Sequence, residues 1–114
     1  MRTNLNELVG NTPLIRLSEK LYAKFETYNP SGSIKDRMVS YILREAERTG
    51  KLKKGDTIIE ATSGNTGIAI AMFGAANGYK VKIVMPGNMS EERKQMMEAF
   101  GASIWPVEDG DFDG

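Results

Sequence analysis

The period of the apolar positions changes near residue 33, and from there the chain predicts alternating helices and strands. Ile34, Met38 and Ile42 recur at helical spacing, so residues 33–48 are expected to form an amphipathic helix. Three later stretches rich in β-branched and apolar residues predict strands, and the segments between them predict helices. The expected strands are 56–61, 79–86 and 103–107, and the expected helices are 65–77 and 90–102.

Strands that alternate with helices of about a dozen residues are typical of βαβ units. Such units run in parallel with right-handed crossovers, so the expected fold class is α/β, a three-layer parallel sheet of βαβ units. The helix at 65–77 is apolar almost all round, which predicts the sheet on one side of it and a neighbour on the other. Gly78 is expected to end this helix.

The first 33 residues predict shorter elements. A polar helix is expected at 4–9, a turn at 10–13, and strand-like runs at 13–17 and 21–26. The first of these runs alternates apolar and polar residues, as a half-buried strand does. The organisation of the chain is therefore expected to change at about residue 33.

Composition limits the chemistry that is open to this chain. Its 114 residues suffice for one small domain, and 15 Lys and Arg against 15 Asp and Glu leave no net charge to attract nucleic acid or an anionic membrane. Cysteine and histidine are absent, which excludes disulfides, thiolate metal sites and a histidine general base. No apolar run is long enough to cross a bilayer and no signal peptide is recognisable, so a cytoplasmic protein is expected.

The stretch NPSGSIKDR, residues 29–37, places a lysine at the start of a predicted helix. Ser33 and Asp36 form an approximate capping box, so Lys35 falls in the first turn. The helix dipole disfavours an ammonium there and, helped by burial, lowers the pKa of the amine, which suits a reactive lysine. A solvated lysine whose charge is balanced by Asp36 is the alternative interpretation.

The stretch ATSGNTG, residues 61–67, lies between a predicted strand and a predicted helix. Its small and hydroxyl residues leave backbone N–H groups able to bind an anion, and the helix dipole adds attraction. Open α/β sheets bind ligands at this end of their strands. The spacing matches neither the dinucleotide fingerprint nor a Walker A loop. A carboxylate or phosphate cradle is one interpretation, and a strand-to-helix turn that prefers small residues is the other.

Three motifs in this order resemble the cysteine synthases, a family of fold-type II pyridoxal phosphate (PLP) enzymes. The motifs are NPSGSIKDR, IEATSGNTGIAIAM and VMPGNMSEERKQMMEAFGA, and the opening LNELVGNTPLIRL fits the same family. The resemblance extends from about Leu5 to Trp105. It implies a tryptophan synthase β-like fold and a β-replacement reaction, in which sulfide displaces the leaving group of an O-activated serine to give cysteine.

The resemblance also implies roles for individual residues. Lys35 matches the lysine that forms the internal Schiff base with PLP and later removes the α-proton of the substrate. Asn65 matches the asparagine that hydrogen-bonds the PLP ring hydroxyl. The α-carboxylate of the amino acid substrate is implied to bind a loop made of Thr62, Ser63, Gly64, Asn65 and Thr66.

Only part of the family fold is covered by the resemblance. In the family, the loop that holds the PLP phosphate and the group that faces the pyridine nitrogen come from later sequence. The fold is therefore expected to be incomplete, and this piece is expected to be inactive alone. Residues 1–33 are implied to belong to the larger domain of the family, and residues 34–114 to be part of the smaller one.

The family further implies a homodimer and, for some members, serine acetyltransferase as a partner. Two alternative functions remain. One is another fold-type II reaction, of the cystathionine β-synthase, threonine synthase or dehydratase kind. The other is a non-catalytic α/β module that binds a small anion or a partner chain. The sequence does not distinguish an acetylated from a phosphorylated serine substrate.

Overall fold

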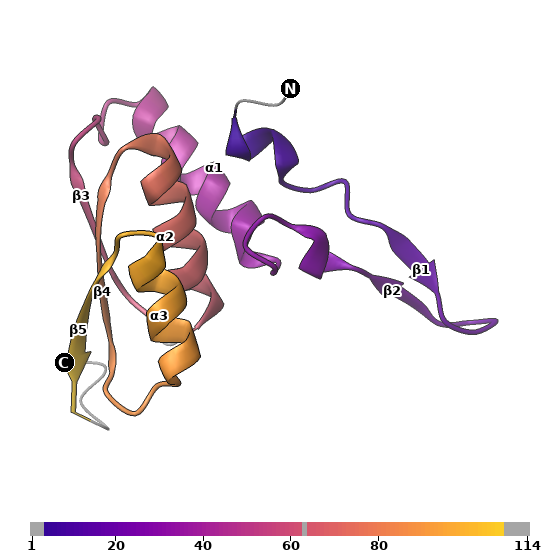
Figure 1. Ribbon diagram of the computed structural model, residues 1–114. Helices are drawn as coiled ribbons and strands as arrows, with labels where there is room; N and C mark the ends of the chain where they lie inside the picture. Colours follow the sequence, from indigo (N-terminus) through magenta and orange to yellow (C-terminus); the bar gives the residue numbers. More distant parts are fainter. Residues whose placement is uncertain (1–3, 63, 109–114) are drawn as a thin grey trace.

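Helices and strands occur close to the positions that the sequence predicts. The computed structural model describes residues 4–62 and 64–108 (Figure 1). Predicted and observed boundaries differ by a few residues at most. In chain order the elements are a 3-10 helix Leu5–Leu8, β1 Leu14–Arg16, β2 Tyr22–Lys24, a 3-10 helix Glu26–Tyr28, α1 Lys35–Arg48, β3 Thr57–Ala61, α2 Asn65–Asn77, β4 Lys80–Pro86, α3 Glu91–Ala99 and β5 Ser103–Val107.

The strands β3, β4 and β5 form a parallel sheet in that order. Val81, Ile83 and Met85 of β4 are buried toward the helices, because alternate residues of a strand face opposite sides. The three α-helices lie together on that face of the sheet (Figure 1). The predicted α/β class and its βαβ units are therefore confirmed. Among the described residues no helix lies on the opposite face, so two of the three predicted layers are observed (Figure 1).

The helix α2 fills the space between the sheet and the other two helices. Ala69 and Phe73 are fully buried, and they share one core with Ile83 and Met97. The apolar character of α2 predicted a neighbour on the side away from the sheet, and two helices, α1 and α3, pack there. Gly78 ends α2 with a left-handed φ of 82°, as predicted. Within the described ranges, no helix is both long and apolar enough to cross a membrane.

Two apolar surfaces stay exposed. The antiparallel hairpin of β1 and β2 projects away from the α/β body (Figure 1). Most of its apolar side chains are exposed. On the uncovered face of the parallel sheet, Ile59 is 64% exposed and Trp105 is 55% exposed. Lys82 Nζ lies 5.0 Å from the centre of the Trp105 ring, in cation–π contact. Surfaces of this kind usually contact further protein.

A polar cluster joins the base of the hairpin to α1. Asn29 is buried, accepts a hydrogen bond from Gly10 N at 2.9 Å, and donates to Glu26 Oε2 at 2.6 Å. Arg37 of α1 pairs with the same Glu26 carboxylate at 3.0 Å and reaches Thr12 Oγ1 at 3.3 Å. The hydrogen bond from Arg37 lowers the pKa of the Glu26 carboxyl. The hairpin is therefore anchored to the helix that begins at the motif lysine.

Tyr79 is expected to make the folded chain less stable at high pH. Burial, together with a 2.6 Å hydrogen bond to Glu47 Oε1, raises the pKa of the Tyr79 phenol to about 12. In the unfolded chain the phenol ionises at about pH 10, so its contribution to stability is complete below that pH and is lost as the pH rises toward 12. Urea unfolding at about pH 9 and about pH 11 measures this loss, which Tyr79→Phe should largely remove. An equal loss in both proteins would contradict the assignment.

Candidate functional site

The turn before Lys35 differs in detail from the one that the sequence predicts. The helix α1 begins at Lys35, whose backbone N–H donates to Ser33 Oγ at 3.2 Å. The predicted capping box of Ser33 with Asp36 is wrong. Asp36 instead accepts hydrogen bonds from the backbone N–H of Ser31, at 2.6 Å, and from the Ser31 hydroxyl. Gly32 has φ +93°, which reverses the chain so that Ser31 can donate to the carboxylate.

Lys35 is the first residue of α1, and its side chain is exposed. The first-turn position predicted from the sequence is thus confirmed, but the burial that was expected to assist the lysine is not present in the described part of the chain. The dipole of α1 still acts at this position, because helix N-termini carry partial positive charge. The exposed amine is accessible to an aldehyde from solution.

The loop 61–67 connects β3 to α2 as predicted, and α2 begins at Asn65. Thr62 is buried, and its hydroxyl accepts a hydrogen bond from Gly64 N at 3.3 Å. The backbone N–H groups of Asn65 and Thr66 have no acceptor among the described residues. These two donors, at the positive end of α2, suit an anion such as a carboxylate. Ser63, the remaining predicted loop residue, lies outside the described residues.

Close packing against α3 restricts the residue that the loop can carry at position 67. A Cβ atom placed on Gly67 would lie 2.7 Å from Thr62 Cγ2, closer than real contacts allow, and 3.2 Å from Met97 Sδ, which is a tight contact. Only glycine therefore fits at this point without moving the loop. The sequence predicted the small residues of this loop, but it did not predict that Met97 of α3 lies beneath them.

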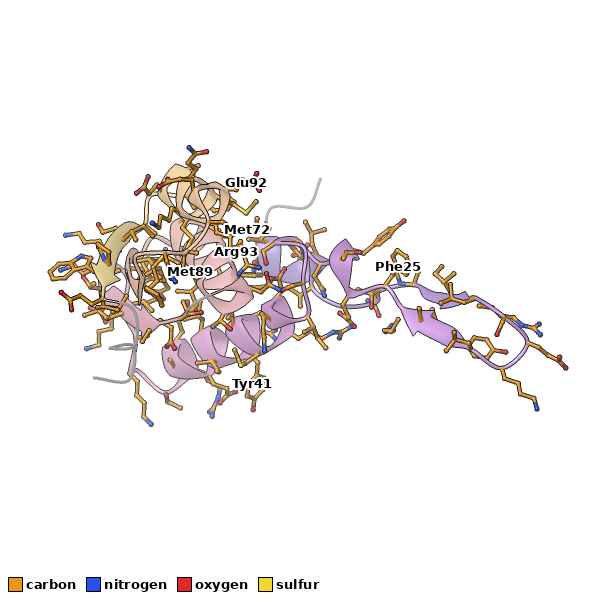
Figure 2. The ribbon with its side chains drawn as sticks, turned by 90° about the horizontal axis from the view of Figure 1, so that it is seen from below. Phe25, Tyr41, Met72, Met89, Glu92 and Arg93 are labelled. Atoms are coloured by element: carbon orange, nitrogen blue, oxygen red, sulfur yellow. The ribbon has the colours of Figure 1, made fainter. Side chains whose placement is uncertain are left out.

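Arg93 is a neighbour of the loop that sequence reasoning missed. It lies in the first turn of α3 (labelled in Figure 2), and its guanidinium comes within 3.2 Å of the point where a Cβ on Gly64 would lie. Ser90 caps α3 as predicted, accepting a hydrogen bond from Arg93 N. A signal was available in the sequence, because a cation in the first turn of a helix is disfavoured by the dipole, as for Lys35. Arg93 therefore adds positive charge beside the loop at Gly64.

An open groove of about 510 Å³ brings the two motifs together. Gly32, Ser33 and Ile34 line it from the turn before Lys35, and Asn65 lines it from the start of α2. The third side is the end of the hairpin at residues 23–27, which includes Phe25 (labelled in Figure 2). Thr62, Gly64 and Lys35 are not among its lining residues. Thr66 faces a different, smaller groove of about 270 Å³ between α1 and α2.

The groove fits a cofactor of the size of PLP, because small-molecule sites in proteins typically enclose about 300–1,000 Å³. The Asn65 side chain supplies both a donor and an acceptor in the groove, which suits a ring hydroxyl. Lys35 follows directly after Ile34, the last groove residue of the turn. Among the described residues, the groove thus joins the Asn65 amide to the turn that leads to Lys35, whose own side chain does not line it.

Comparison with known proteins identifies the family of the chain. Residues 5–114 match the family described as pyridoxal-phosphate dependent enzyme. The chain belongs to the pyridoxal-phosphate dependent enzymes. The resemblance, the fold class and PLP as the cofactor of the family are thereby confirmed. The roles of single residues in this PLP-dependent enzyme chain stay predictions.

Three relatives are particularly informative. Cysteine synthase B of Salmonella typhimurium is 48% identical over 107 residues, which are 88% of this chain and 35% of that protein. The structure of O-ureido-L-serine synthase gives a TM-score of 0.93 at 38% identity, over 100% of this chain and 39% of that one. Cysteine synthase of Entamoeba histolytica gives 0.88 at 43% identity, over 95% of this chain and 35% of that one. The PLP-dependent enzyme chain thus spans 35–39% of the length of these relatives.

Proposed function

We propose that this chain supplies the lysine-bearing turn and the substrate loop of a cysteine synthase, which joins sulfide to an O-activated serine to form cysteine. The observation that carries the proposal is the groove in which Asn65 of one motif faces the turn that leads to Lys35 of the other. The similarity to cysteine synthase B supports the choice of reaction.

Each residue of the site has a proposed task. PLP, when bound, supplies the electron-withdrawing ring that no side chain of this protein offers. Lys35 holds the cofactor through its amine and moves the proton at the α-carbon of the substrate. Asn65 orients the cofactor through its amide, and the loop holds the substrate carboxylate. The loop residues in this proposal are Thr62, Ser63, Gly64, Asn65 and Thr66.

The exposed surfaces support a proposal about the rest of the fold. Residues 1–33 are assigned to the larger domain of the family, and residues 34–114 to part of the smaller one. The hairpin of β1 and β2 has open edges and exposed apolar residues, as expected of strands that pair within a larger sheet. We further assign the whole enzyme a homodimeric state, a cytoplasmic location and serine acetyltransferase as a partner.

A chimeric protein tests the proposed reaction. Residues 5–108 of this chain would replace the matching part of cysteine synthase B from Salmonella typhimurium. We expect the chimera to bind PLP and to form cysteine from sulfide and O-acetyl-L-serine or O-phospho-L-serine, measured as product over time. A folded chimera that binds PLP but converts neither substrate would contradict the proposal. Conversion of a different β-substituted serine would favour another fold-type II reaction instead.

A further inference from the structure

Asp36 is a fully buried carboxylate in the first turn of α1. Its side chain is 0% exposed, and its two oxygens accept hydrogen bonds from the backbone N–H and the hydroxyl of Ser31. Across residues 4–62 and 64–108, no lysine or arginine forms an ion pair with it. A single residue, Ser31, thus provides its hydrogen-bond donors in the described part of the chain.

A stability role explains this arrangement poorly. The helix dipole favours a carboxylate in the first turn, but removing that carboxylate from water is costly. A buried, hydrogen-bonded polar pair can instead select one conformation. Here the pair closes the chain reversal at Gly32 and draws residues 31–34 against the start of α1.

The conformation selected by Asp36 determines how Lys35 is presented. The two side chains are consecutive on a helix and so point about 100° apart, which leaves Lys35 exposed while Asp36 is held inward. The backbone N–H of Lys35 is bonded to Ser33 within the same turn. That turn also carries the groove residues that face Asn65.

We propose that Asp36, acting through Ser31, is a positioning residue: it fixes the turn from which Lys35 extends, next to the groove assigned to the cofactor. The inference rests on the proposed function, because it concerns the lysine that would carry PLP. The carboxylate acts by geometry and touches neither cofactor nor substrate.

Selective labelling of lysine tests the inference on the 114-residue chain. The chain is incubated with PLP, whose aldehyde carbon forms a bond to a lysine nitrogen with loss of water, and borohydride then supplies the hydride that makes this bond permanent. Mass spectrometry of the digested chain gives the label on Lys35 relative to Lys51, an exposed lysine just beyond the other end of α1. Positioning should make Lys35 the preferred site.

Four variants separate positioning from stability. Asp36→Ala should lower the Lys35 preference about tenfold, and Ser31→Ala should lower it less, because one of the two hydrogen bonds survives. Asp36→Asn should keep most of it, since an amide can accept from Ser31 N and donate to Ser31 Oγ. Ser40→Ala is the matched control: Ser40 is also buried on α1, and it donates to Asn6 Oδ1 at 2.9 Å. Ser40→Ala should lower the unfolding midpoint and leave the labelling preference for Lys35 unchanged.

The outcomes are distinguishable when labelling is done at a temperature where circular dichroism shows each variant folded. A preference for Lys35 that falls most in Asp36→Ala, falls less in Ser31→Ala and is kept in Ser40→Ala supports the inference. Equal preference in all variants overturns it and leaves the proposed function standing. Absence of preference in the unmutated chain also overturns it, and an active chimera would show that the proposed function survives. If Asp36→Ala does not fold, the other two variants test the inference: Ser31→Ala should lower the preference for Lys35, and Asp36→Asn should keep most of it.

Discussion

Replacing Lys35 by alanine in the chimera with cysteine synthase B is expected to lower cysteine formation by at least about 10²–10⁴-fold, the usual contribution of a positioned acid or base. The loss should appear in kcat, because the amine is needed to hold the cofactor and to move the α-proton rather than to bind the substrate alone. Initial rates at saturating substrate, with PLP in excess, measure it. Visible absorbance of the bound cofactor should change as well.

The matched control for this variant is Lys51→Ala. Lys51 is an exposed lysine that follows α1, so its removal changes the charge by the same amount without reaching the groove. It should leave both rate and spectrum unchanged. A Lys35→Ala chimera that keeps more than about a tenth of the rate would show that another group does the chemistry assigned to this lysine.

Replacing Gly74 by valine is expected to lower the free energy of unfolding by about 3 kcal/mol, a large loss for a single substitution. A Cβ atom at Gly74 would lie 2.3 Å from Val81 Cγ2, so α2 and β4 would have to move apart. That interface holds the core residues Phe73 and Ile83. Urea unfolding with a constant slope measures the change as a lower midpoint.

Ala75→Val is the control for this prediction. Ala75 is the next residue on the same helix and is exposed, so the β-branched side chain costs helix propensity alone, about 0.5 kcal/mol. Shortening Val81 to alanine should restore part of the stability lost in Gly74→Val, because the two positions touch. Equal losses for Gly74→Val and Ala75→Val would mean that the close approach of α2 to β4 is not tight in solution.

The fold after residue 33 was largely predictable from the sequence, because its signals are local. Apolar period, the Ser90 cap and the Gly78 stop each depend on neighbouring residues, and all three agree with the structure. The first-turn position of Lys35 follows from the same local reasoning. The extent of the loop before α2 was predictable for the same reason.

What the sequence did not predict depends on contacts between distant segments or on competition between near neighbours. Ser31 outcompetes Ser33 for Asp36 because of the backbone reversal at Gly32, which propensity does not specify. The hairpin end lines the groove beside Asn65 although about 40 residues separate them in the chain. Arg93 reaches Gly64 from a helix whose packing is set by the whole core.

The central claim is that this chain carries a cofactor lysine presented at a groove shared by its two motifs. The most direct measurement is the distribution of borohydride-trapped PLP over the lysines of the unmutated, folded 114-residue chain. We expect Lys35 to carry most of the label and Lys51 to carry little. A distribution in which Lys35 is labelled no more than the other exposed lysines would contradict it.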